Sequence, residues 1–190
     1  MLKEAYYFEN MNGEFAYMLG CLDQAVDFLF NTGKTLNYPN TFDSDLFEIE
    51  EDFKENISAI MKERFKLYQK YSDRGESYGK AEKQKELVEN FHIELKQLDE
   101  TDIKKAVYTM YEKNGDKTPE ASKAVKDSAE FLERELTSIL NSGNPKALYT
   151  CDLSAEAHDT MHMFYNWGIN DVLFIEYEGY LVLLTFGWDD

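Results

Sequence analysis

Two histidines four positions apart form the one spacing in the sequence that is typical of a metal site. They are His158 and His162, in the segment HDTMH. On a helix, residues i and i+4 share a face, so two imidazoles at this spacing can bind one divalent ion. Asp159 replaces the glutamate of the zinc-peptidase pattern HExxH, which shortens the reach of a general base by one methylene. No spacing selects a third ligand among Cys151, Asp171 and Glu176.

The cysteines and the common catalytic motifs give no support for an enzyme. Cys21 and Cys151 lie too far apart in the sequence to form a CxxC pair, and two cysteines do not make a disulfide framework. Cys21 lies in an apolar stretch, and Asp152 beside Cys151 raises a thiol pKa. The sequence contains no GxSxG, P-loop, GxGxxG or kinase motif. We expect no catalytic residues, no cofactor and no metal, with a metal-dependent hydrolase using His158 and His162 as an alternative.

The densest group of charges lies between positions 43 and 55. Lys54 alone opposes its acids, which are Asp43, Asp45, Glu48, Glu50, Glu51, Asp52 and Glu55. A helix predicted over 45–71 would place four of them, Asp45, Glu48, Asp52 and Glu55, on one face. Those charges would average one per ~4 Å of helix axis, against one phosphate per ~3.4 Å of a nucleic-acid strand. Such a face would imitate a phosphate backbone and attract a basic nucleic-acid channel.

Aromatic residues beside these acids are candidate anchors of a protein interface. The predicted partner-binding residues are Asp43, Asp45, Glu48, Glu51, Asp52, Glu55, Tyr38 and Phe42. Both features also have an explanation that needs no partner. Acids near a helix start interact favourably with the helix dipole, and aromatic rings at the edge of a core leave their hydroxyl groups in water.

The negative charge is concentrated in the two flanks of the chain. The formal net charge is −17, from 37 acidic and 20 basic side chains. Residues 1–52 carry −9, residues 53–140 carry −1 and residues 141–190 carry −7. A pI of about 4.5 argues against nucleic acid or an anionic membrane as a direct ligand. The segregated charge instead favours a basic protein partner, provided that the two flanks meet in the fold.

Hydrophobic periodicity predicts a mostly helical α+β domain with about five to six helices. The chain has 190 residues, of which 43% are hydrophobic, enough for a core of its own. Apolar residues recur at intervals of three and four over most of the chain. The expected helices span residues 14–31, 45–71, 80–98, 101–114, 118–141 and 154–167, and Ala147–Leu153 reads as extended. Ser154 is the expected N-cap of the last helix, with Glu156 in its first turn.

The C-terminal 20 residues change in character and predict a β-hairpin packed on the helices. The segment DVLFIEYEGYLVLLTFGWDD is β-branched and aromatic, with Glu178-Gly179 as its turn. Its second arm, Tyr180 to Phe186, is apolar on both faces and must be covered on both sides. We expect one domain over 1–190: an acidic helical part at 1–72, charge-balanced helices at 78–141, and a helix plus hairpin at 154–188.

These features together predict an acidic inhibitor that blocks the basic nucleic-acid-binding surface of a partner enzyme. A phage anti-defence protein and a toxin-immunity protein both fit this description. The alternative is an assembly protein or homodimer in which the apolar hairpin meets a partner.

The first 15 residues carry Glu4, Glu9 and Glu14 rather than the basic start and apolar core of a signal peptide. No uncharged run is long enough to span a membrane, so a cytoplasmic location is expected.

Overall fold

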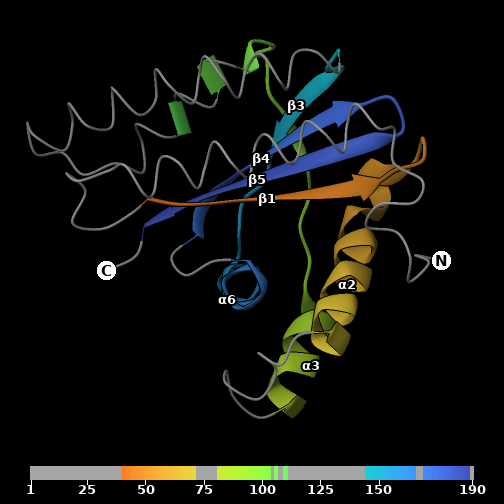
Figure 1. Cartoon of the computed structure of the whole chain (residues 1–190), viewed down its shortest axis with the longest axis vertical. Helices are drawn as coiled ribbons and strands as arrows, with labels where there is room; N and C mark the ends of the chain where they lie inside the picture. Colours follow the sequence, from red (N-terminus) through yellow and green to blue (C-terminus); the bar gives the residue numbers. More distant parts are fainter. Residues whose placement is uncertain are drawn as a thin grey trace, which may run out of the picture.

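The sheet and its helices are defined by a computed structural model that describes residues 40–71, 81–103, 105–106, 109–110, 144–165 and 169–188. The strands are antiparallel and lie in the order β1-β5-β4-β3-β2. The elements are β1 (Asn40–Glu48), α2 (Phe53–Tyr71), α3 (Ala81–Asn90), β2 (Lys96–Gln97), β3 (Ala147–Thr150), α6 (Ala155–Phe164), β4 (Ile169–Tyr177) and β5 (Tyr180–Trp188). The three helices lie on the same side of the sheet (Figure 1).

The C-terminal hairpin is confirmed and forms the centre of the sheet. Strands β4 and β5 pair from Ile169↔Gly187 to Tyr177↔Tyr180, with Glu178 and Gly179 between them. Gly179 has a φ of 74°, a conformation that glycine adopts without the steric cost of a Cβ atom. Strand β5 lies between β1 and β4, and every residue from Leu181 to Phe186 is buried. Its apolar character on both faces follows from this central position.

The segment expected to start a long helix forms the edge strand β1 instead. The prediction of a helix from residue 45 is wrong, because Asn40–Glu48 pairs along its whole length with β5, from Asn40↔Trp188 to Glu48↔Tyr180. The helix begins only at Phe53. The apolar residues Leu46, Ile49 and Phe53 happen to repeat at helical intervals, but pairing with β5 outweighs this local pattern.

The main core lies between the sheet and the three helices. On α2, the buried apolar residues Phe53, Ile57, Met61 and Phe65 follow each other every four positions and face the sheet. The ring of Phe65 stacks on Phe164 at 4.6 Å between centroids and meets Phe91 edge-on at 5.0 Å. These contacts join α2 to α6 and to the segment after α3. The sheet contributes the buried residues Phe47, Tyr149, Val172, Phe174, Leu181 and Leu183.

The expected fold class is therefore wrong in its balance of helix and strand. The described residues form three helices and a five-stranded antiparallel sheet, rather than five to six helices with a single hairpin. The helix expected over 80–98 ends at Asn90, and the chain continues into strand β2. Its later apolar residues, Leu95 and Leu98, are partly buried beside the sheet rather than on a helix. The extended segment after Pro145 is confirmed as β3.

The short helix after Ser154 is also confirmed. Helix α6 begins at Ala155, and the Ser154 side chain accepts a hydrogen bond from the backbone N–H of Ala157 at 3.2 Å. Glu156 lies in its first turn, as the helix dipole favours. The helices expected at 14–31 and 118–141, together with Cys21, lie outside the described residues. Among the described helices, none is long and apolar enough to cross a lipid bilayer.

Candidate functional site

The end of β1 meets the hairpin turn, and this contact brings the acidic residues of 48–52 close to the turn of the C-terminal hairpin. Beyond the last strand pair, Glu48↔Tyr180, the backbone N–H of Ile49 donates a hydrogen bond to the carbonyl oxygen of Gly179 at 3.0 Å. The loop from Ile49 to Asp52 and the first turn of α2 therefore start beside Glu178. We call the carboxylates around this junction the acidic end: Glu48, Glu50, Glu51, Asp52, Glu55, Glu176 and Glu178.

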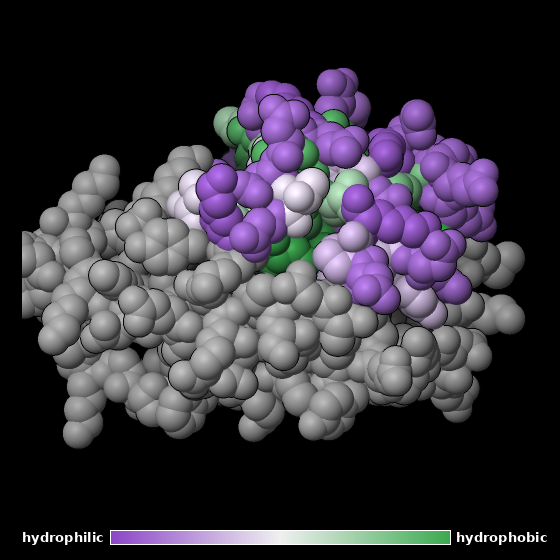
Figure 2. Space-filling view, turned by 90° about the horizontal axis from the view of Figure 1, so that it is seen from above, coloured by the Kyte–Doolittle hydropathy of each residue, from purple (hydrophilic) through white to green (hydrophobic). Residues whose placement is uncertain are grey.

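The acidic end carries far more negative than positive charge. All of its acids are exposed except Glu176, which is partly buried. Two lysines among the described residues reach it: Lys146 pairs with Glu178, and Lys54 lies 3.9 Å from Glu176 Oε2. Glu178 is 89% exposed despite its lysine, so it presents its charge to solvent. Figure 2 shows the predominance of hydrophilic residues on the described part of one face of the molecule.

Tyr149 connects the acidic end to the core beneath it. Its buried hydroxyl donates a hydrogen bond to Glu176, and Lys54 Nζ lies 5.0 Å from the centre of its ring. Burial, followed by the hydrogen bond to Glu176, raises the pKa of Tyr149. The pKa of Lys54 is also raised, chiefly by its hydrogen bond with Tyr149 and also by the nearby carboxylates. Both side chains therefore keep their usual protonation states at neutral pH.

Of the predicted partner-binding residues, Asp45 lies in the interior rather than on the surface. It is 7% exposed, and its Oδ2 accepts a hydrogen bond from the Tyr165 hydroxyl at 2.9 Å. Arg64 Nε lies 3.5 Å from the same oxygen, and the Arg64 guanidinium also donates to the carbonyl of Leu46. Asp45 thus joins β1 to α2 and to the end of α6.

The remaining predicted acids are divided among strand β1, the loop after it and the first turn of α2. Glu48, Glu51, Asp52 and Glu55 are exposed at the acidic end, but they do not share a helix face because α2 starts at Phe53. Asp43 and Phe42 lie in β1, opposite Thr185 and Phe186. Tyr38 lies outside the described residues. Glu176 and Glu178 were missed as members of this surface, since no local signal shows that β1 pairs with β5.

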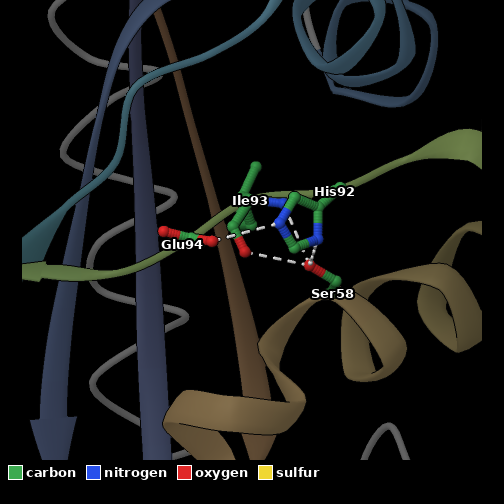
Figure 3. Close-up of polar contacts among 4 residues, drawn as sticks. All are labelled: Ser58, His92, Ile93 and Glu94. Atoms are coloured by element: carbon green, nitrogen blue, oxygen red, sulfur yellow. Dashed lines mark hydrogen bonds and ion pairs between the residues drawn. The ribbon is translucent and has the colours of Figure 1, made fainter.

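A second polar group, also absent from the sequence-based prediction, joins α2 to the segment after α3 (Figure 3). His92 lies between Ser58 and Glu94: its Nδ1 is 3.4 Å from Ser58 Oγ and its Nε2 is 3.4 Å from Glu94 Oε1. The order serine, histidine, carboxylate is that of a catalytic triad. No sequence motif marks it, because Ser58 and His92 come from different elements.

The contacts of Ser58 favour a structural role for this group. Its Oγ donates to the carbonyl of Ile93 at 3.0 Å and accepts from the N–H of Ile93 at 2.9 Å. The hydroxyl proton is therefore directed to a backbone carbonyl and not to His92. His92 and Glu94 have side chains that are 71% and 83% exposed, so nothing keeps water from their contact. Through these two hydrogen bonds, Ser58 connects α2 to the backbone of Ile93.

The two histidines predicted as candidate metal ligands do lie together on α6. The centroids of the His158 and His162 rings are 5.8 Å apart, as the i, i+4 spacing predicts. Within the described part of the chain, no group of three or more His, Cys, Asp or Glu side chains is arranged to hold a metal ion. The proposed third ligands Cys151, Asp171 and Glu176 are therefore not grouped with the histidine pair.

Cys151 is buried and its pKa is raised to about 12, first by burial and then by Asp152. A thiol of this kind stays protonated at neutral pH and is a poor nucleophile.

Comparisons of the chain with protein-family models, with curated proteins and with solved structures find no match. The chemistry of the described residues is thus the basis for a functional interpretation.

Proposed function

We propose that this protein binds the basic surface of another protein through its acidic end, and that it acts as an inhibitor occupying the nucleic-acid channel of a partner enzyme. The observation that carries this proposal is the hydrogen bond from Ile49 N–H to the Gly179 carbonyl at 3.0 Å. This bond joins the acidic loop after β1 to the acidic turn between β4 and β5. Acidic residues that are far apart in the sequence thereby lie close together on one surface.

The electrostatics of the acidic end suit fast association with a basic partner. Clustered charges of one sign raise the local concentration of an oppositely charged partner and speed its encounter. Channels that bind nucleic acid are rich in lysine and arginine because they neutralise phosphates. Carboxylates in loops and turns can approach such a channel without moving the sheet or the helices. The partner would thus be a nuclease or a defence enzyme, and the inhibitor a phage anti-defence or toxin-immunity protein working in the cytoplasm.

The arrangement differs from a regular imitation of a phosphate backbone. Glu48 ends a strand, Glu51 lies in a loop and Glu55 lies in the first turn of α2. Recognition would therefore depend on the density of negative charge and not on a helical repeat that matches the spacing of phosphates.

The alternatives are less well supported by the described contacts. The assembly hypothesis began from the apolar second arm of the hairpin, but β5 pairs with β1 on one side and β4 on the other. Its backbone therefore has no open edge for a partner strand. The hydrolase hypothesis needs a third ligand beside His158 and His162, and the described residues do not group one with them.

A direct test is inhibition of nucleic-acid cleavage by a panel of basic nucleases and defence enzymes. We expect the protein to slow cleavage by its partner and to compete with the nucleic acid substrate. Raising the salt concentration from about 50 to 200 mM should weaken the complex markedly, because charge pairs at a surface are screened. An affinity that does not respond to salt would contradict an electrostatic interface.

Two triple variants with the same net charge separate the acidic end from the overall charge of the protein. The test variant is Glu48→Lys, Glu50→Lys and Glu51→Lys, all exposed at the acidic end. The matched control is Glu63→Lys, Glu86→Lys and Asp99→Lys, which are exposed elsewhere. The test variant should lose inhibition while the control retains most of it. Equal loss in both would show that only net charge matters and would overturn the proposed site.

A further inference from the structure

The two histidines of α6 lie at the boundary between the core and solvent. Both side chains are partly exposed, and the His158 side chain is 37% exposed. The core-facing residues of the helix, Ala157, Thr160 and Met161, are buried beside them. One α-helical turn separates the two histidines, so their rings are held on adjacent turns of a helix that Ser154 caps.

The separation of the rings fits two ligands of one metal ion. A zinc–imidazole bond is about 2.0–2.1 Å long, which places a ring centroid about 3.2 Å from the metal. Two imidazoles that share one ion can thus have centroids no farther apart than about 6.4 Å. The observed separation of 5.8 Å lies within this limit, so the two rings are close enough to bind the same ion.

Asp159 places a carboxylate near the His158 ring. Its Oδ1 lies 3.9 Å from His158 Nδ1. In metal sites the histidine nitrogen that does not bind the metal usually donates its N–H to a carboxylate, which fixes the tautomer and leaves the other nitrogen as the ligand. At 3.9 Å the two atoms are beyond hydrogen-bond distance, and a side-chain rotation that closed this gap would leave Nε2 of His158 as the metal-binding atom.

We propose that His158 and His162 form an open two-histidine clamp for a divalent transition-metal ion such as Zn²⁺, with water in the remaining coordination positions. Imidazole nitrogen suits zinc, copper and nickel, whereas magnesium and calcium prefer oxygen ligands. The clamp belongs to α6 and not to the acidic end, so this proposal is independent of the proposed inhibitory function.

Titration of the purified protein with Zn²⁺, followed by calorimetry, tests the clamp. We expect one equivalent to bind and the melting temperature to rise with the Zn²⁺ concentration, because a ligand of the folded state stabilises it. His158→Gln and His162→Gln should each weaken binding by at least about tenfold, since even the loss of a supporting residue costs that much in metal sites. Mg²⁺ should give no comparable effect.

His92 provides a matched control, because the chain has three histidines and His92 lies in the segment after α3 rather than on α6. His92→Gln should bind Zn²⁺ as the unchanged protein does. Binding that survives both α6 substitutions, binding that is lost only with His92→Gln, or no saturable binding would overturn the proposal. Circular dichroism checks that each variant is folded. If His162→Gln does not fold, the partly exposed His158 decides the test.

Discussion

The hydroxyl of Tyr165 donates a hydrogen bond to Asp45 Oδ2 at 2.9 Å, between residues 120 positions apart in the chain. Asp45 belongs to the edge strand β1, and Tyr165 follows the last residue of α6. The carboxylate also lies 3.5 Å from Arg64 Nε on α2. One buried carboxylate thus connects three elements that the sequence alone does not relate.

Replacing Asp45 should destabilise the protein strongly. We expect Asp45→Ala to lower the free energy of unfolding by about 3–5 kcal/mol, because it removes the carboxylate beside the buried guanidinium of Arg64. Tyr165→Phe should cost less, about 1.5–3 kcal/mol, since one hydrogen bond to a charged group is lost. Urea denaturation measures both values. If Asp45→Ala costs no more than Glu48→Ala, an exposed substitution in the same strand, the importance assigned to this contact is wrong.

Ser58→Ala should loosen the segment that follows α3. The change removes the acceptor of the Ile93 N–H and the donor to its carbonyl, which should cost about 1–3 kcal/mol. Hydrogen exchange at the Ile93 amide should become faster, because this N–H loses its partner.

His92→Ala distinguishes this structural role from catalysis. If Ser58 only connects α2 to the Ile93 backbone, His92→Ala should leave the free energy of unfolding and the hydrogen exchange of the Ile93 amide almost unchanged. The reason is that the contact between His92 and Ser58 is long and exposed. Hydrolysis of an activated ester that disappears in both variants, and not in Glu63→Ala, would instead support a catalytic group.

Gly179→Ala should destabilise the hairpin through the backbone alone. The residue has a φ of 74°, and a Cβ atom there would meet nothing within 4 Å. The expected cost is about 1–2 kcal/mol, the penalty of the left-handed conformation for a residue with a Cβ. Gly179→Asn should cost less, because asparagine tolerates this conformation better. Equal losses for alanine and asparagine in thermal unfolding would contradict this explanation.

Cys151 should make the protein less stable in alkali. Burial raises its folded-state pKa from 9.0 to about 12, so the folded protein retains a proton that the unfolded chain releases. The stabilisation from this group is complete below pH 9 and is lost as the pH rises toward 12, at about 1.4 kcal/mol per pH unit. Cys151→Ala should flatten this decline in denaturant unfolding measured between pH 8 and 11. The same slope in the variant would contradict the burial of the thiol.

Short-range signals allowed the correct prediction of some elements. The turn of the hairpin is marked by Glu178 and Gly179, and the start of α6 by Ser154, all of which act through neighbours in the sequence. The strand β1 depends on a distant partner: Asp45 is paired with Leu183. A helical spacing of apolar residues over 46–57 therefore led to a helix, because no local feature reveals the edge of β5.

The sequence predicts which acidic residues belong to the candidate site better than it predicts their arrangement in space. Glu48, Glu51 and Asp52 are exposed, as a partner-binding surface requires, whereas Asp45 is buried with Arg64. An acid in a charged stretch gives no sign that an arginine 19 residues later will meet it inside the core. Equally, the approach of Glu178 to the loop after β1 follows from strand order, which depends on the whole sheet.

The strand order has a consequence for the way the chain is made. Strand β1 can pair only after residues 180–188 have left the ribosome, because β5 is its neighbour. Until then Phe47 and the apolar face of α2 lack the strands that cover them in the finished sheet. Nascent chains that are stalled before Tyr180 would therefore be prone to aggregation and would depend on chaperones. Folding of this sheet must follow synthesis of its last strand and cannot proceed steadily from the amino terminus.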